Sequence, residues 1–154
     1  MSVTTDQPAS SAGRGIAAAD VGLLVLRIAL ATVFIAHGGQ KMFGWFGGKG
    51  LEATIAGMAQ GGIPAPLAFL AAFTEFFGGL AVLVGLLSRL ASLGLFITML
   101  VAVFGVHLKG GFFLPAGFEF AFTLGMMSLA LILIGPGRIA IADIEGRLFR
   151  RRGK

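Results

Sequence analysis

The chain alternates between long apolar segments and short links that are polar or rich in glycine. A helix needs about 20 apolar residues to cross the hydrocarbon core of a bilayer. Four segments approach that length, and they run from about Val21 to Phe43, Ala65 to Leu87, Leu90 to Leu108 and Phe118 to Gly135. Since the links are short, we predict an all-α fold, an integral membrane four-helix bundle.

Prolines and glycines mark the limits of two of these segments. Pro64 and Pro66 suit the opening turn of the second helix, because proline is tolerated where the backbone N–H has no helical partner. Gly135 and Pro136 then end the fourth segment.

Composition agrees with the segment pattern. Of the 154 residues, 56% are hydrophobic and only 12% are charged, and the mean hydropathy is +0.94. A soluble domain of this size has too little interior to bury so much apolar surface, whereas a bilayer accepts it on the outside of the protein. We therefore expect contact with the lipid bilayer along most of the chain.

Basic residues divide unevenly between the two sides of the predicted bundle. One side receives three, namely Lys41, Lys49 and Lys109, and the other receives eight, namely Arg14, Arg89, Arg138, Arg147, Arg150, Arg151, Arg152 and Lys154. Cytoplasmic segments carry the excess of lysine and arginine. This predicts a multi-pass protein of the bacterial cytoplasmic (inner) membrane, with the N and C termini in the cytoplasm.

Three regions follow from these patterns. Residues 1–19 are predicted to be a flexible N-terminal tail, residues 20–137 a four-transmembrane-helix domain, and residues 138–154 a basic cytoplasmic C-terminal tail. The stretch IAIADIEGRLF in the last region is expected to form a short amphipathic helix on the membrane surface. Its basic run suits anionic lipid, and we expect no nucleic acid partner.

The chain has no cysteine, which narrows its chemistry. Disulfides, thiolate metal sites, covalent c-type haem and cysteine-bound iron–sulfur clusters all require a thiol. Nucleotide-binding glycine loops of the usual spacings are also absent from the sequence. Redox chemistry would therefore need a bound cofactor or a partner.

Two opposite charges are predicted to lie deep in the membrane. Glu75 falls near the middle of the second segment, about 15 Å from its outer end, and Arg27 lies about 10 Å in from the cytoplasmic end of the first. At a rise of about 1.5 Å per residue their depths differ by only about 5 Å, so we predict that they pair. The pair has two open interpretations, a structural one that fixes helix register and a functional one in which it lines a cavity.

A second group of ionisable residues is predicted near the outer face. His37 and Lys41 share a face of the first helix, His107 ends the third and Glu119 begins the fourth. The spacing of these side chains does not match a metal motif, so we predict no metal site. Two histidines are a weak signal for b-type haem, so we favour other chemistry there.

We favour a quinone-type site in this region. Binding and reducing a quinone requires hydrogen-bond donors at its carbonyl oxygens and a route for protons, and ionisable side chains at membrane depth supply both. The candidates for ligand binding or for a proton route are Arg27, His37, Lys41, Glu75, His107 and Glu119, and no catalytic residue is assigned. Aromatic residues that can pack a flat ring and a prenyl tail are Phe34, Phe43, Trp45, Phe76, Phe77 and Phe104.

Taken in order, several motifs resemble the DoxX family of small bacterial membrane proteins. They are Arg27 in the first segment, HGGQKMFG from His37, GGIP before the second segment, EFFGGLAVLVGLLSR from Glu75, GFEFAF, and GPGRIAIAD. The resemblance covers about residues 21–143. It implies a four-helix membrane bundle in which Arg27, Lys41, Glu75, Arg89 and Glu119 occupy the family's recurring polar positions.

The resemblance also implies an association with redox work. The wider group includes the small subunit of thiosulfate:quinone oxidoreductase and a component of a membrane complex tied to oxidative-stress defence. We therefore predict an accessory subunit of a quinone-linked oxidoreductase, with quinone as the ligand and a redox or other membrane protein as partner. The alternative is a non-catalytic scaffold or assembly partner whose buried charges only specify helix packing, and a homo-oligomer is compatible with either.

Overall fold

The computed structural model describes residues 16–141, and within them the chain folds into helices joined by turns. The predicted N-terminal tail lies outside the described residues up to position 15, and most of the basic C-terminal tail, with its predicted amphipathic helix, lies outside them as well. The predicted all-α membrane bundle is confirmed. Three helices are long and apolar enough to cross a membrane, and a fourth apolar helix is shorter.

The first span is helix α1, Ala18–Phe43. It begins three residues before the predicted start and ends where predicted. Gly44 stops it in the left-handed conformation with φ of 73°, which glycine adopts without a steric cost.

The second span is a single run of helix over residues 65–84 that changes its winding in the middle. It consists of α3 (Ala65–Phe73), the π-helical segment η2 (Thr74–Gly78) and α4 (Gly79–Val84). Pro64 and Pro66 flank its first residue, as predicted. Gly85, with φ of 78°, ends the span three residues before the predicted limit.

The third and fourth spans form a helical hairpin. The third consists of α5 (Ser88–Val101), the π-helical η3 (Ala102–His107) and the 3₁₀-helical η4 (Leu108–Gly110). The fourth is α6 (Glu119–Ile134), whose 16 residues extend about 24 Å at the usual rise. That length is short for a bilayer crossing, so α6 falls below the criterion that the other three spans meet.

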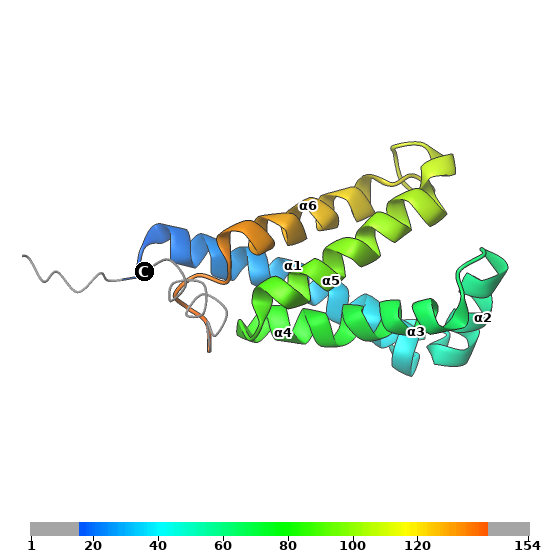
Figure 1. Cartoon of the computed structure of the whole chain (residues 1–154), viewed down its shortest axis with the longest axis horizontal. Coiled ribbons are helices and arrows are strands. Elements are labelled where there is room, and N and C mark those ends of the chain that lie inside the picture. The colour runs from blue at the N-terminus through cyan, green and yellow to red at the C-terminus, as the bar shows by residue number, and fades with distance from the viewer. Residues whose placement is uncertain (1–15, 142–154) are drawn as a thin grey trace, which may run out of the picture.

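Two short helices between the first two spans were not predicted. They are η1 (Trp45–Gly47) and α2 (Gly50–Gln60), and neither contains a buried residue. In Figure 1, α2 lies at the end of the molecule opposite the start of α1.

Small residues allow the spans to approach closely. Ala68 and Ala72 of α3 are fully buried, and a Cβ atom added at Gly38 of α1 would overlap the backbone of Phe76. Lipid offers no hydrophobic drive for helix association, so close backbone contact of this kind is the main packing device. The larger core side chains are Leu30, Phe34, Val82, Leu95, Met99, Val103, Leu124 and Leu131.

The spans are not equally close along their lengths. Helix α5 packs against α6 throughout, and α1 packs against η2 and α4. Helix α4 contacts α5, but α3 and α5 diverge towards the end that carries α2 (Figure 1). The bundle is therefore tightly closed at the end where α1 begins and splayed at the other.

Candidate functional site: a lysine–glutamate pair in an apolar cavity

An ion pair joins the first span to the second at the splayed end. Lys41 Nζ lies 2.5 Å from Glu75 Oε1 and 2.6 Å from Glu75 Oε2, so the ammonium donates to both carboxylate oxygens. The Glu75 side chain is 3% exposed and that of Lys41 27%. The carboxylate is thus enclosed, while part of the lysine remains accessible.

Local structure explains how these two side chains meet. Helical side chains tilt towards the N-terminus of their own helix, so Lys41, in the last turn of α1, reaches back into the membrane. Glu75 belongs to η2, and a π-helical turn shifts the direction in which its side chains project. Such turns occur often at functional sites because they aim a side chain that a regular helix would place elsewhere.

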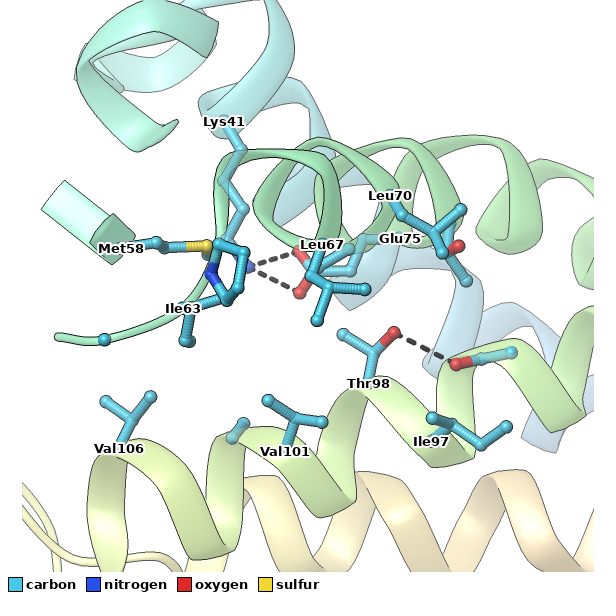
Figure 2. A pocket seen from close by; sticks show the side chains of 16 residues that line it. Lys41, Met58, Ile63, Leu67, Leu70, Glu75, Ile97, Thr98, Val101 and Val106 are labelled. Carbon is cyan, nitrogen blue, oxygen red and sulfur yellow. Dashed lines mark hydrogen bonds and ion pairs between the residues drawn. The ribbon is translucent and has the colours of Figure 1, made fainter. Parts of the chain in front are cut away.

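The pair forms part of the wall of a cavity of about 440 Å³. Its other walls come from α2, the link after it, α3, α5 and η3, and most of them are apolar. Figure 2 shows Lys41 and Glu75 near Leu67 of α3, with Thr98 and Val101 of α5 on the opposite side. The remaining lining residues include Met58, Gly62, Ile63, Pro64, Leu70, Ala71, Thr74, Gly94, Ile97, Ala102 and Val106.

The lysine retains hydrogen-bonding capacity on this cavity. An ammonium group has three N–H donors, and the two oxygens of Glu75 accept two of them. Thr98 also lines the cavity, but its hydroxyl donates to the Gly94 carbonyl at 3.0 Å within its own helix. A bound acceptor oxygen would therefore find its charged donor at Lys41.

The predicted pairing of Arg27 with Glu75 is wrong. Arg27 is 1% exposed, and its guanidinium donates to four backbone carbonyl oxygens. Two belong to the end of α4, at 2.8 Å from Val82 and 2.5 Å from Leu83. The other two follow α6, at 3.1 Å from Pro136 and 2.5 Å from Ile139.

The physical reason is the same tilt that brings Lys41 to Glu75. The Arg27 side chain leans towards the start of α1, away from the middle of the membrane. There it meets the C-terminal end of α4, whose last carbonyls have no partner within the helix. Arg27 thus acts as a cap for another helix and as a clamp on the chain after α6.

Arg89 makes a comparable clamp within the hairpin of the third and fourth spans. It lies in the first turn of α5 and donates to the carbonyls of Ile132, Leu133 and Ile134 at the end of α6, with 3.0 Å to Leu133 and 3.1 Å to Ile134. Positive charge at a helix C-terminus also complements the helix dipole. The family resemblance included this arginine, but residue-by-residue reasoning did not assign it a role.

The predicted outer cluster does not form one site, because among its members only Lys41 lines the cavity. His37 is exposed, and its Nδ1 lies 2.9 Å from the Val33 carbonyl of its own helix. Nδ1 of His107 lies 3.3 Å from the Ala116 carbonyl, and Glu119 accepts from the Leu114 amide at 2.9 Å. Within residues 16–141, no three His, Asp or Glu side chains gather as metal ligands would.

The predicted aromatic packing residues also lie outside the cavity. Phe43, Trp45 and Phe76 pack on one another, with ring centroids 5.0–5.5 Å apart. Phe34 is in the core and Phe104 is exposed. The cavity is instead lined by aliphatic residues and by two threonines, Thr74 and Thr98, which sequence reasoning missed. The sequence marks these threonines only weakly as cavity residues. Thr74 directly precedes Glu75, and Thr98 shares a helix face with Gly94.

Fold and site together define a small helical membrane protein with a charged pair on an apolar cavity. The DoxX family model matches residues 22–108, more than half of the chain, and the chain belongs to the DoxX family. The matched region contains Arg27, Lys41 and Glu75 but ends before Glu119. No solved structure matches the chain.

Three curated relatives match most of the chain. CatD of Bacillus subtilis (strain 168), named as a candidate oxidoreductase, is 31% identical over 73% of this chain and 79% of its own length. The inner membrane protein YphA of Escherichia coli (strain K12) is 33% identical over 81% of this chain and 91% of its own. An uncharacterised protein of Haemophilus influenzae is 31% identical over 84% of this chain and 92% of its own.

Proposed function

We propose that the protein is an accessory membrane subunit of a quinone-linked oxidoreductase and that it holds a quinone, or a similar carbonyl-bearing molecule, in the cavity beside Lys41. The observation that carries the proposal is the Lys41–Glu75 pair on the wall of an apolar cavity of about 440 Å³. Ligand sites are typically apolar spaces of this order with a few polar groups that orient the ligand.

The two charged residues have different roles in this proposal. Lys41 directs its remaining N–H to a carbonyl oxygen of the ligand, and Glu75 positions the ammonium through two hydrogen bonds. The carboxylate also balances the lysine charge, which would be costly if left alone at membrane depth. Electrons come from a partner oxidoreductase, since the chain has no cysteine for thiol-based redox chemistry. The name of CatD supports an association with redox chemistry.

We propose that both termini lie in the cytoplasm, at the inner membrane. The chain brings Arg89 and Arg138 to the end where α1 begins, since the Arg138 amide donates to Asp20 at 2.9 Å and Arg89 caps the end of α6. Lys41 belongs to the opposite end. This separation of basic residues supports the orientation expected from the positive-inside rule, and a reporter enzyme fused to each terminus tests it.

A binding titration tests the ligand. The purified protein in detergent is titrated with decyl-quinone, and bound quinone is measured after gel filtration. Lys41→Met removes a charged hydrogen bond worth about 1.5–3 kcal/mol, so we expect binding to weaken about ten-fold or more. Lys49→Met, at an exposed lysine of the same end, is the matched control and should bind as the parent does.

One observation favours the scaffold alternative. Arg27 and Arg89 show that this fold uses arginine side chains to hold helix ends, and the Lys41–Glu75 ion pair can be interpreted as a third device that holds helices together. The double variant Lys41→Met/Glu75→Leu separates the two functions, because it removes both charges and leaves neither one unpaired. A parent that binds no quinone, together with a double variant that is stable where Lys41→Met and Glu75→Leu alone are not, would favour the scaffold.

A further inference from the structure

Two walls of the cavity are formed by exposed apolar residues of the second and third spans. Its side walls are Leu67 and Leu70 of α3 and Ile97 and Val101 of α5, and these side chains are 46–56% exposed although they line the cavity. All four belong to segments long and apolar enough to span the membrane. In a bilayer we expect their exposed surface to face hydrocarbon. Helices α3 and α5 diverge at this end of the molecule (Figure 1), so we expect the cavity between them to open sideways into the bilayer.

The end of the cavity nearest the water is covered. Met58 of α2 and the link residues Gly62, Ile63 and Pro64 line it there, in the segment between the first two spans. Figure 2 places Met58 and Ile63 beside the lysine end of the cavity, away from Ile97 and Leu70. A water-soluble ligand would have to pass this cover, whereas a lipid-soluble one would not.

The charged groups of the cavity sum to zero. Lys41 and Glu75 are the two charged residues among those that line it, and they pair with each other. An anionic head would gain little from a lysine already neutralised at 2.5 Å, and it would lose its hydration in the apolar space. An uncharged head with an acceptor oxygen satisfies the remaining N–H of the lysine without that loss.

We infer that the cavity takes a membrane-dissolved amphiphile with an uncharged, oxygen-bearing head, which passes sideways between α3 and α5 and leaves its hydrocarbon tail in the bilayer. This inference rests on the proposed ligand-binding role of the cavity, and it extends that role from quinones to a class of lipids defined by head charge and route of access.

Spin labels at single introduced cysteines test the route, because the natural chain has no cysteine to interfere. Val101→Cys reports on the cavity wall, Leu93→Cys on a lipid-facing position of α5 that does not line the cavity, and Lys109→Cys on an exposed position in η4. In liposomes, collisions of each label with oxygen, which dissolves in lipid, are compared with collisions with a water-soluble nickel chelate.

The expected result is that the Val101→Cys label behaves like the Leu93→Cys label, with oxygen collisions dominant. Nickel access comparable to that at Lys109→Cys would overturn the inference, since the cavity would then open to water. A label at Val101→Cys reached by neither reagent would also overturn it, because a protein segment such as a second copy would then fill the opening.

Photoreactive amphiphiles test the head charge. A diazirine fatty alcohol and the fatty acid with the same tail are compared in liposomes, and the labelled residues are mapped by mass spectrometry. The parent protein should be labelled in the cavity by the alcohol in preference to the ionised acid. Glu75→Gln leaves the lysine charge unbalanced, so labelling by the acid relative to the alcohol should rise about five-fold or more.

Glu52→Gln, at an exposed carboxylate of α2, is the matched control and should leave the ratio unchanged. No rise in Glu75→Gln, with the protein still folded by gel filtration, would overturn the charge argument. The outcome also separates this inference from the quinone proposal. A parent protein that binds no quinone but is labelled in the cavity by the alcohol would contradict the proposed ligand and support the inference.

Discussion

The two ends of the bundle use a cation of α1 in opposite ways. At the end where α1 begins, Arg27 directs its guanidinium to four carbonyls of two other segments, and the helices are tightly closed around it. At the splayed end, Lys41 holds one carboxylate and keeps a donor beside a cavity. A charged side chain within a span thus points to ligand binding when it keeps a hydrogen-bond donor that the protein itself does not use. Depth in the membrane alone does not distinguish such a residue from one that only holds helices together.

The largest effect should come from Arg27→Leu. The change removes a guanidinium that donates to four carbonyls in a buried or part-buried region, so we expect a loss of about 3–5 kcal/mol in the free energy of unfolding, or failure to fold. Thermal unfolding in detergent measures it, with Lys109→Gln at an exposed position as control. A stable Arg27→Leu protein would remove the contrast between the two ends.

The next effect should come from Glu75→Gln. The amide keeps the shape of the carboxylate but not its charge, so Lys41 loses a charge-assisted contact at 2.5 Å. We expect a stability loss of about 1.5–3 kcal/mol and quinone binding at least about ten-fold weaker. Binding that is unchanged while stability falls would make the Lys41–Glu75 pair a structural device like the Arg27 clamp.

A smaller effect on stability, with a clear effect on binding, should come from Gly94→Ala. A Cβ atom there would lie 2.9 Å from Cγ2 of Thr74, which also lines the cavity. Thr74 can turn its side chain, so we expect a stability change within about 1 kcal/mol. The filled space should weaken quinone binding several-fold in the titration above. The matched variant Gly105→Ala lies outside the cavity, and its added Cβ would meet Cγ1 of Val101 at an ordinary contact distance of 3.9 Å, so it should not weaken binding.

The smallest effect should come from His37→Ala. His37 is exposed and bonds only to a carbonyl of its own helix, apart from a ring contact with Phe120 at 6.0 Å. We expect stability within about 0.5 kcal/mol of the parent and unchanged quinone binding. A strong loss of binding in this variant would restore the predicted outer cluster and contradict the cavity as the site.

The sequence predicted the spans well because hydrophobic length is a direct consequence of bilayer thickness. The predicted and observed limits of the spans differ by at most three residues. The largest differences are at the start of α1 and at the end of α4. Helix α2 was missed because it is short, glycine-rich at both ends and has no buried face to impose a hydrophobic period.

The pairing predicted for the charged residues was wrong, because Glu75 pairs with Lys41 and Arg27 donates to backbone carbonyls. Depth was estimated from backbone rise, and this ignores the several ångströms by which a lysine or arginine side chain leans back along its helix. The estimate also treated a carboxylate as the natural partner of Arg27, although backbone carbonyls at the end of α4 lie within its hydrogen-bonding reach. The π-helical turn that aims Glu75 leaves no recognisable pattern in the sequence.

Trp45 can serve as an intrinsic fluorescent probe of the cavity. It is the single tryptophan of the chain, and its ring packs edge-on against Phe76, the neighbour of Glu75 along the backbone. Quinone rings quench indole emission over short distances, so occupation of the space beside Lys41 should dim the natural fluorescence without any attached dye. The time course of the fluorescence after quinone is added would then show how quickly the quinone enters the cavity from the surrounding membrane.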